Sequence, residues 1–191
     1  MEDVLGALKA LGVSYGYDSY VKWRRTLKVG LIVNPIAGMG GPVGLKGTDG
    51  VLEEALKRGA KPVAPLRARI FLSLLSKYIS SDSAYFLVAP GVMGEDYIKN
   101  TGFRYKVVGE VHGSKTTRHD TIRITREMLR EGMDLLVFVG GDGTARDVLE
   151  ALDRKVPVLG VPSGVKMYSG VFAVTPHEAS QLIRLFIAVS Y

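Results

Sequence analysis

The chain has 191 residues, a formal net charge of +6 at neutral pH and no cysteine. The absence of cysteine excludes a disulfide framework, a thiolate nucleophile and cysteine-ligated zinc. No run of 18 uncharged apolar residues occurs, so we predict no membrane span and no membrane partner. The Met-Glu-Asp start lacks the basic and apolar regions of a secretory leader, which favours a cytoplasmic location.

The positive charge favours anionic ligands such as nucleotides and phosphorylated metabolites. It is spread over small groups of residues, for example Arg67/Arg69 and Arg123/Arg126/Arg130, and forms no polybasic tail. We therefore expect no nucleic-acid partner.

Residues 1–26 are predicted to form a helical appendage. Four apolar residues near the start have helical spacing, and an aromatic group follows them. The apolar residues are Val4, Leu5, Leu8 and Leu11, and the aromatic ones are Tyr15, Tyr17, Tyr20 and Trp23. We expect this segment to pack on the domain or to contact another subunit.

Residues 27–191 are predicted to form one domain in which strands alternate with helices. The strands are rich in Val, Ile and Leu without polar alternation, as in a parallel sheet covered on both faces. The pattern predicts an α/β, three-layer Rossmann-like domain with a mostly parallel sheet and helices on both faces. The predicted strands are 27–33, 84–89, 105–111, 135–139, 156–161 and a short 171–174, and the predicted helices are 50–57, 67–79, 93–99, 120–130, 145–152 and 176–189.

The most informative motif follows the strand at 135–139. It reads Gly140, Gly141, Asp142, Gly143 and Thr144. Glycines let backbone N–H groups approach phosphate oxygens without interference from a Cβ atom. Ligands of open parallel sheets bind at the carboxyl ends of the strands, where Asp142 is expected to lie. The motif therefore indicates phosphate chemistry.

A second glycine-rich loop follows the strand at 27–33. Between residues 38 and 50 it holds six glycines. Long loops at strand ends of an α/β domain usually carry function. The residues expected to contact phosphate, ribose or metal are Asn34, Gly38, Gly40, Gly41, Lys46, Thr48 and Asp49.

A third loop follows the strand at 156–161. Ser163 offers a hydroxyl, Gly164 an unobstructed N–H group and Lys166 a positive charge. Any one of these loops is also compatible with an ordinary turn. Three such loops at three strand ends favour one shared binding site.

Other familiar motifs fit poorly. A Walker loop requires Gly-Lys, which occurs nowhere in the chain, and the glycines of residues 38–43 fail the dinucleotide-binding pattern at its third position. Residues 12–16 match Gly-x-Ser-x-Gly, but no core strand precedes them. His112 and His119 lack the i, i+4 spacing of paired metal ligands on a helix.

The combination of Asn-Pro-x-x-Gly at residues 34–38 with Gly-Gly-Asp-Gly-Thr at residues 140–144 resembles the NAD kinase-like superfamily. The longer loops are similar to ATP-NAD kinase and acetoin-catabolism protein X homologues, and the resemblance covers about residues 27–176. It implies an N-terminal nucleotide-binding domain that binds ATP and Mg²⁺, with NAD as a possible acceptor. It also implies homo-oligomers.

The resemblance assigns roles to the motif residues. Asp142 would activate the acceptor hydroxyl or help to hold Mg²⁺, for which Asp49 is a second candidate ligand. Asn34 would contact the phosphates from the opposite loop, and the helix expected from Ala145 would point its positive end at them. The triphosphate would lie against Gly140, Gly141, Gly143 and Thr144.

Two departures leave the activity open. We expect the family's C-terminal β-rich domain, with its acceptor-binding motif, to be absent from these 191 residues. Arg146 and Asp147 stand where many NAD kinases have apolar residues, either as a local surface pair or as a mark of a different acceptor. The alternatives are a kinase for another acceptor, such as a lipid or a small metabolite, and a non-catalytic nucleotide-binding or assembly module.

Overall fold

The computed structural model describes residues 26–39, 57, 59–111, 115–164 and 167–190. The predicted appendage, except Thr26, and the predicted helix at 50–57, except Lys57, lie outside the described residues. So do six of the expected site residues, namely Gly40, Gly41, Lys46, Thr48, Asp49 and Lys166.

The centre of the fold is a five-stranded sheet in which all pairings are parallel. Its strand order is β3-β2-β1-β4-β5, so the chain reverses its direction of winding between β1 and β4. Ligands of doubly wound sheets bind at this switch point, outside the carboxyl ends of the strands. The strands are β1 (Leu27–Val33), β2 (Ala84–Val88), β3 (Arg104–Val107), β4 (Leu135–Gly140) and β5 (Val158–Pro162).

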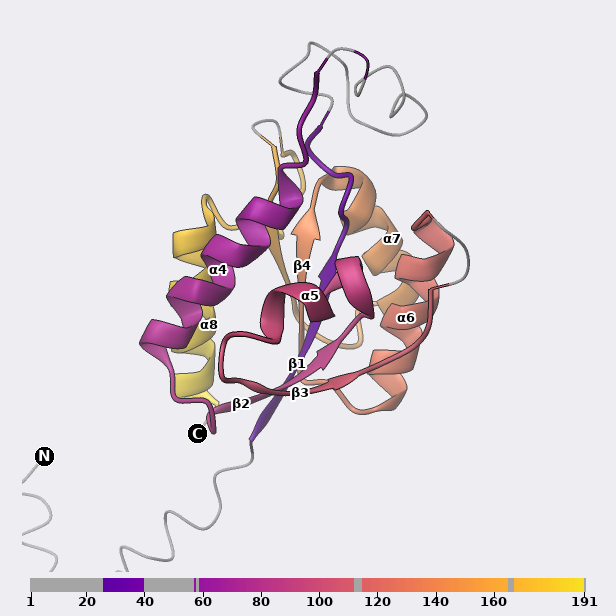
Figure 1. The fold of residues 1–191 in the computed structure, drawn as a ribbon. Helices are drawn as coiled ribbons and strands as arrows, with labels where there is room; N and C mark the ends of the chain where they lie inside the picture. Colours follow the sequence, from indigo (N-terminus) through magenta and orange to yellow (C-terminus); the bar gives the residue numbers. More distant parts are fainter. Residues whose placement is uncertain (1–25, 40–56, 58, 112–114, 165–166, 191) are drawn as a thin grey trace, which may run out of the picture.

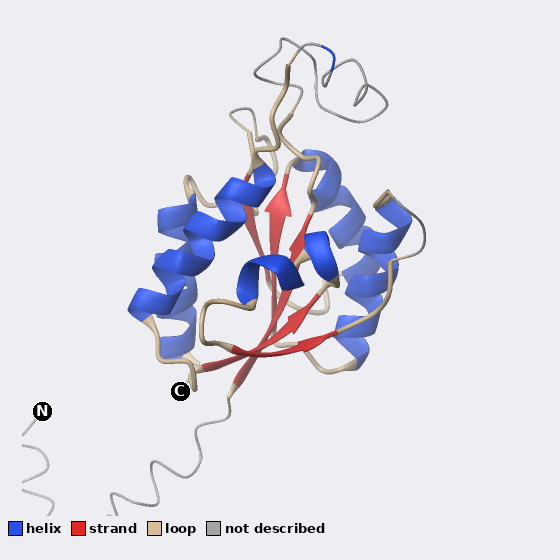
Figure 2. Cartoon of the chain, in the orientation of Figure 1, coloured by secondary structure: helices blue, strands red, loops and turns tan. Residues whose placement is uncertain are grey.

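Helices cover both faces of the sheet and complete three layers (Figures 1 and 2). Helices α4 and α8 lie together on one face, and α6 and α7 lie together on the other. The short elements η2 and α5 follow β2. The helices are α4 (Ala64–Tyr78), η2 (Gly91–Met93), α5 (Glu95–Ile98), α6 (Arg118–Arg130), α7 (Asp142–Leu152) and α8 (Pro176–Val189).

The central strands explain why both faces are covered. Side chains alternate between the faces of a strand. In β1, Leu31 therefore packs with the core under α4 and α8, while Ile32 packs with the core under α6 and α7. Every residue of β4 is buried. This double burial matches the predicted three-layer α/β fold.

Several predicted elements differ from the structure. The helix expected from Ala145 begins at Asp142, with Gly141 as its N-cap. Residues 171–174 form no strand, since Phe172 makes only an isolated bridge to Gly160. Strand β3 ends at Val107 rather than at 111, and the helix expected at 93–99 is divided into η2 and α5. Among the described residues, no helix is both long and apolar enough to cross a membrane.

Candidate functional site

The candidate site lies at the carboxyl ends of β1 and β4, on the first turn of α7. Gly140 ends β4, Gly141 caps α7, and Asp142 is the first residue of that helix. A Cβ atom at Gly140 would lie 2.5 Å from Oγ1 of Thr144, so only glycine fits there. The N-terminus of α7 carries free N–H groups and partial positive charge, which suit an anion.

Asn34 ties the loop after β1 to this turn. Its Nδ2 donates a hydrogen bond of 3.0 Å to Oγ1 of Thr144, which is 3% exposed. Its Oδ1 accepts a bond of 3.3 Å from the N–H of Ile36, and its own N–H donates to the carbonyl of Val139 at 2.9 Å. Asn34 therefore fixes both its own turn and the start of α7.

Gly38 brings the same loop against the loop after β5. It has a φ of +82°, and a Cβ atom there would lie 1.9 Å from the carbonyl oxygen of Ser163. The N–H of Ser163 donates to the carbonyl of Gly140 at 3.0 Å. All three predicted loops thus meet at one edge of the sheet.

Ser163 has an unusual side chain. The residue is fully buried, and its hydroxyl has no hydrogen-bond partner among the described residues. Leaving a buried polar group without a partner costs about 1–3 kcal/mol. Such a group at the edge of three glycine loops suits a ligand that supplies the missing partner.

The Asp142 carboxylate is held by the loop after β5. It accepts hydrogen bonds from the N–H of Tyr168 at 3.0 Å, from the N–H of Ser169 at 2.9 Å and from Oγ of Ser169 at 2.6 Å. Burial raises the pKa of Asp142, but these hydrogen bonds and nearby Arg146 outweigh it, and the pKa lies below its usual value. Asp142 is therefore ionised at neutral pH.

A hollow of about 440 Å³ lies on the loop that holds this carboxylate. Ser169 lines it and hydrogen bonds to Asp142. Met167 and Phe172 supply apolar wall, and Arg67 of α4 supplies a positive charge. The hollow therefore offers an organic anion both apolar contact and charge neutralisation next to Asp142.

Asp142 is the candidate metal ligand of this site. No group of three or more His, Cys, Asp or Glu side chains among the described residues is arranged to hold a metal ion. Mg²⁺ commonly binds through one or two carboxylates, with phosphate oxygens and water as its other ligands. Asp142 beside the N-terminus of α7 fits that type of site.

The fold and the site define a doubly wound α/β domain whose glycine loops meet at its switch point. The family model "ATP-NAD kinase N-terminal domain" matches residues 29–191, and the chain therefore belongs to that family. The comparisons with curated proteins and with solved structures give no match.

Sequence reasoning named most of the residues that meet here. The structure brings together Asn34, Gly38, Gly140, Gly141, Asp142, Gly143, Thr144, Ser163 and Gly164. It adds residues that sequence reasoning did not single out, namely Arg67, Met167, Tyr168 and Ser169. The available signal for Ser169 was a hydroxyl within the third glycine-bearing loop.

Proposed function

We propose that this domain binds ATP with Mg²⁺ and serves an enzyme that transfers the γ-phosphoryl group to a hydroxyl, with the 2′-hydroxyl of NAD as the favoured acceptor. The observation that carries the proposal is the junction of three loops around the first turn of α7. Asn34, Gly38 and Asp142 each tie one loop to another there. Membership of the ATP-NAD kinase family supports it.

The phosphates would bind to N–H groups at the start of α7 and to the hydroxyl of Ser163, which has no hydrogen-bond partner in the part of the chain that the structure describes. Mg²⁺ would neutralise charge on the phosphate oxygens. In the transfer, the acceptor oxygen bonds to the γ-phosphorus, the bond to the β,γ-bridging oxygen breaks and ADP leaves. The proton of the acceptor hydroxyl passes to Asp142 or to water. Such reactions depend mainly on positioning and charge neutralisation.

The lowered pKa of Asp142 bears on its role. A carboxylate that is charged at neutral pH attracts Mg²⁺ and accepts a hydrogen bond from the acceptor hydroxyl. It is a weak base, because an effective general base has a pKa near the working pH. We therefore assign Asp142 to orientation and electrostatic stabilisation more than to strong proton abstraction.

Calorimetric titration with ATP tests the proposal. In the presence of Mg²⁺ the folded domain should bind ATP, and EDTA should weaken that binding. Asp142→Asn should remove most of the Mg²⁺ effect, because it keeps the shape of the side chain and removes its charge. Asp153→Asn, at the other end of α7, is the matched control. Absence of ATP binding at millimolar concentration would refute the proposal.

The hollow beside Ser169 favours a second candidate. At about 440 Å³ it lies in the lower half of the range for small-molecule sites, and Arg67 suits an acidic group. The acceptor in this case is a small anionic metabolite instead of NAD. An acceptor panel followed by ADP release separates the two. Nucleotide binding without turnover on any acceptor would favour a non-catalytic module.

A further inference from the structure

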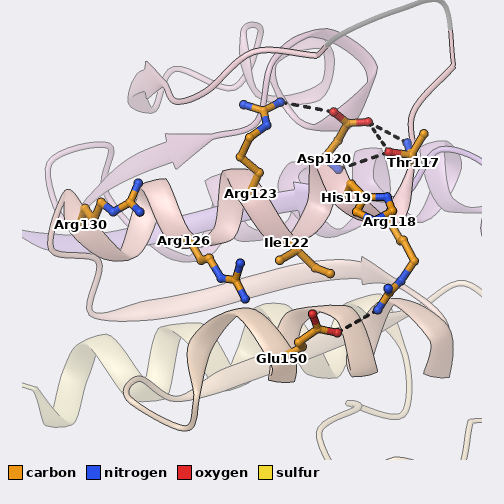
Figure 3. A pocket seen from close by; sticks show the side chains of 9 residues that line it. All are labelled: Thr117, Arg118, His119, Asp120, Ile122, Arg123, Arg126, Arg130 and Glu150. Atoms are coloured by element: carbon orange, nitrogen blue, oxygen red, sulfur yellow. Dashed lines mark hydrogen bonds and ion pairs between the residues drawn. The ribbon is translucent and has the colours of Figure 1, made fainter.

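A second and larger hollow, of about 630 Å³, lies along α6 and α7. None of the residues that line it belongs to the three glycine loops. Figure 3 shows Arg118 and Arg126 extending from α6 towards α7, one on each side of Ile122, with Glu150 of α7 facing them. Two guanidinium groups thus flank an apolar floor.

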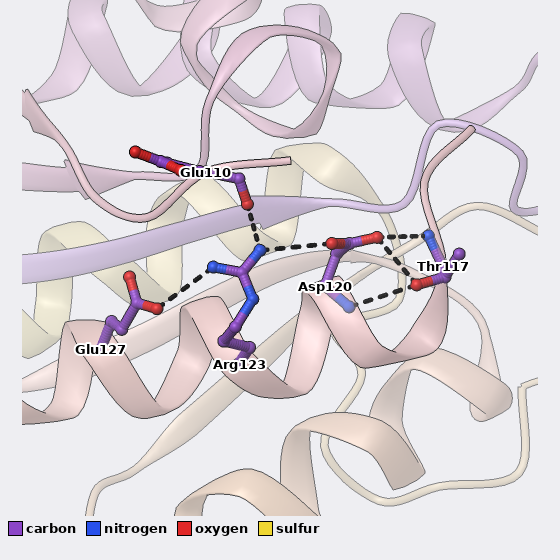
Figure 4. A network of polar contacts seen from close by, with 5 residues as sticks. All are labelled: Glu110, Thr117, Asp120, Arg123 and Glu127. Atoms are coloured by element: carbon purple, nitrogen blue, oxygen red, sulfur yellow. Dashed lines mark hydrogen bonds and ion pairs between the residues drawn. The ribbon is translucent and has the colours of Figure 1, made fainter. Parts of the chain in front are cut away.

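Arg123 of α6 makes contacts that stabilise the fold. It forms ion pairs with Asp120 at 3.3 Å and with Glu127 at 3.2 Å, and it donates to the carbonyl of Glu110 (Figure 4). Asp120 also forms a capping box with Thr117 at the start of α6. This arginine joins the segment after β3 to α6, and its charge is balanced locally.

Arg126 and Arg130 make no comparable contacts with the described residues. Their side chains are exposed and make no hydrogen bond or ion pair with any residue that the structure describes. Both line the hollow, at one-turn spacing on the same face of α6. Their charges are therefore available to a ligand.

Arg118 is paired with two carboxylates of α7, since its Nε lies 3.1 Å from Oδ1 of Asp147 and its Nη2 contacts Oε2 of Glu150. Of these two ion pairs, the one with Glu150 is weak enough to be exchanged. The two side chains are 2.9 Å apart, but both are about half exposed, at 53% and 52%. An exposed pair of this kind contributes about 0–1 kcal/mol. A phosphate group carries more charge than a carboxylate and binds arginine through two parallel hydrogen bonds. Phosphate can therefore displace Glu150 from Arg118.

We propose that this hollow binds the diphosphate group of a small phosphorylated molecule, with Arg118 and Arg126 as its main ligands. Both arginines line the hollow, on either side of Ile122, so each of them can bind one of two linked phosphates. The hollow has the volume of a small-molecule site. The negative charge of Glu150 at the wall of the hollow interrupts the positive surface of the arginines. An extended polyanion is therefore a less favourable ligand than a small one.

NMR titration of the ¹⁵N-labelled protein with pyrophosphate at constant ionic strength tests this site. Saturable amide shifts are expected in α6 and α7 around Arg126 and Glu150. Arg126→Gln should weaken binding at least about tenfold. Glu150→Gln should strengthen it about two- to fivefold, because it removes the more exposed of the two carboxylates that pair with Arg118. Shifts at residues 140–144 would report the proposed nucleotide site separately.

Arg184→Gln on α8 is the matched control, since it removes one positive charge from the opposite face of the sheet. It should leave pyrophosphate binding at α6 unchanged. Equal weakening by Arg184→Gln, or absence of saturable shifts in α6 at millimolar pyrophosphate, would overturn the proposal. A single-stranded oligonucleotide that shifted the same amides at far lower concentration would also overturn it, since the site would then belong to a nucleic acid.

Discussion

Gly38→Ala should separate the loop after β1 from the loop after β5. At a φ of +82° an alanine costs about 1–2 kcal/mol more than glycine. Its Cβ atom would also lie 1.9 Å from the carbonyl oxygen of Ser163, where contacts below 3.0 Å essentially never occur. The two backbones must therefore move apart by about 1 Å. Overpacking of this kind adds about 1–3 kcal/mol.

The expected loss is about 2–5 kcal/mol in the free energy of unfolding, measured by urea denaturation. Gly102→Ala is the matched control. Gly102 has a φ of +81°, but nothing lies within 4 Å of a Cβ atom built there. In the control, alanine adopts the unfavourable backbone conformation without any clash, so its free energy of unfolding should fall by only about 1–2 kcal/mol.

The difference between the two variants measures the close approach of the loops. Equal losses would mean that Gly38 and Ser163 do not touch, and the three-loop junction would be wrong. ATP titration of the folded Gly38→Ala variant gives a second measure. Because the substitution moves Ser163 away from Gly38, nucleotide affinity should fall in this variant and stay unchanged in Gly102→Ala.

Three further predictions concern polar contacts. Asn34→Ala should cost about 1–3 kcal/mol in urea denaturation, because the nearly buried hydroxyl of Thr144 loses its partner. Burial raises the pKa of Asp120, but hydrogen bonds from Thr117 and Arg123 hold it below its usual value. Its stabilisation is present above the unfolded pKa of about 3.9 and is lost as the pH falls through the folded pKa. Asp120→Asn should therefore flatten the decline in urea midpoint below about pH 4. Arg123→Gln should lower the melting temperature more than Arg126→Gln, which breaks no contact with a described residue.

Some elements could be placed from the sequence because their signals are local. Strand β1 has the predicted bounds, Leu27–Val33, and is a mostly apolar stretch between Thr26 and Asn34. Helix α8 also has the predicted bounds, Pro176–Val189. At its start, the Thr175 side chain accepts hydrogen bonds from backbone N–H groups of the first turn. Proline occupies that turn, where a residue without an N–H group costs the helix no hydrogen bond.

The start of α7 shows where local reasoning fails. The glycine motif was predicted to form a turn, with the helix starting at Ala145, and glycine in a helix interior is indeed unfavourable. The structure begins the helix at Asp142, where Asn34 and the loop after β5 hold its first turn in place. Contacts from residues far away in sequence outweigh a propensity of about 1 kcal/mol. The contact of Ser169 with Asp142 spans 27 residues and has no local signature.

The hydrogen bonds of Asp142 also limit how this carboxylate can act. Ionised, it has about four acceptor positions on two oxygens. Oδ1 accepts from the N–H and the hydroxyl of Ser169, and the N–H of Tyr168 is shared between Oδ2 at 3.0 Å and Oδ1 at 3.3 Å. Oδ2 therefore keeps the position that is open to Mg²⁺ or to an acceptor hydroxyl. Because Ser169 also lines the adjoining hollow, a ligand there contacts the same residue that orients Asp142. A ligand bound in this hollow would therefore affect the orientation of the Asp142 carboxylate through Ser169.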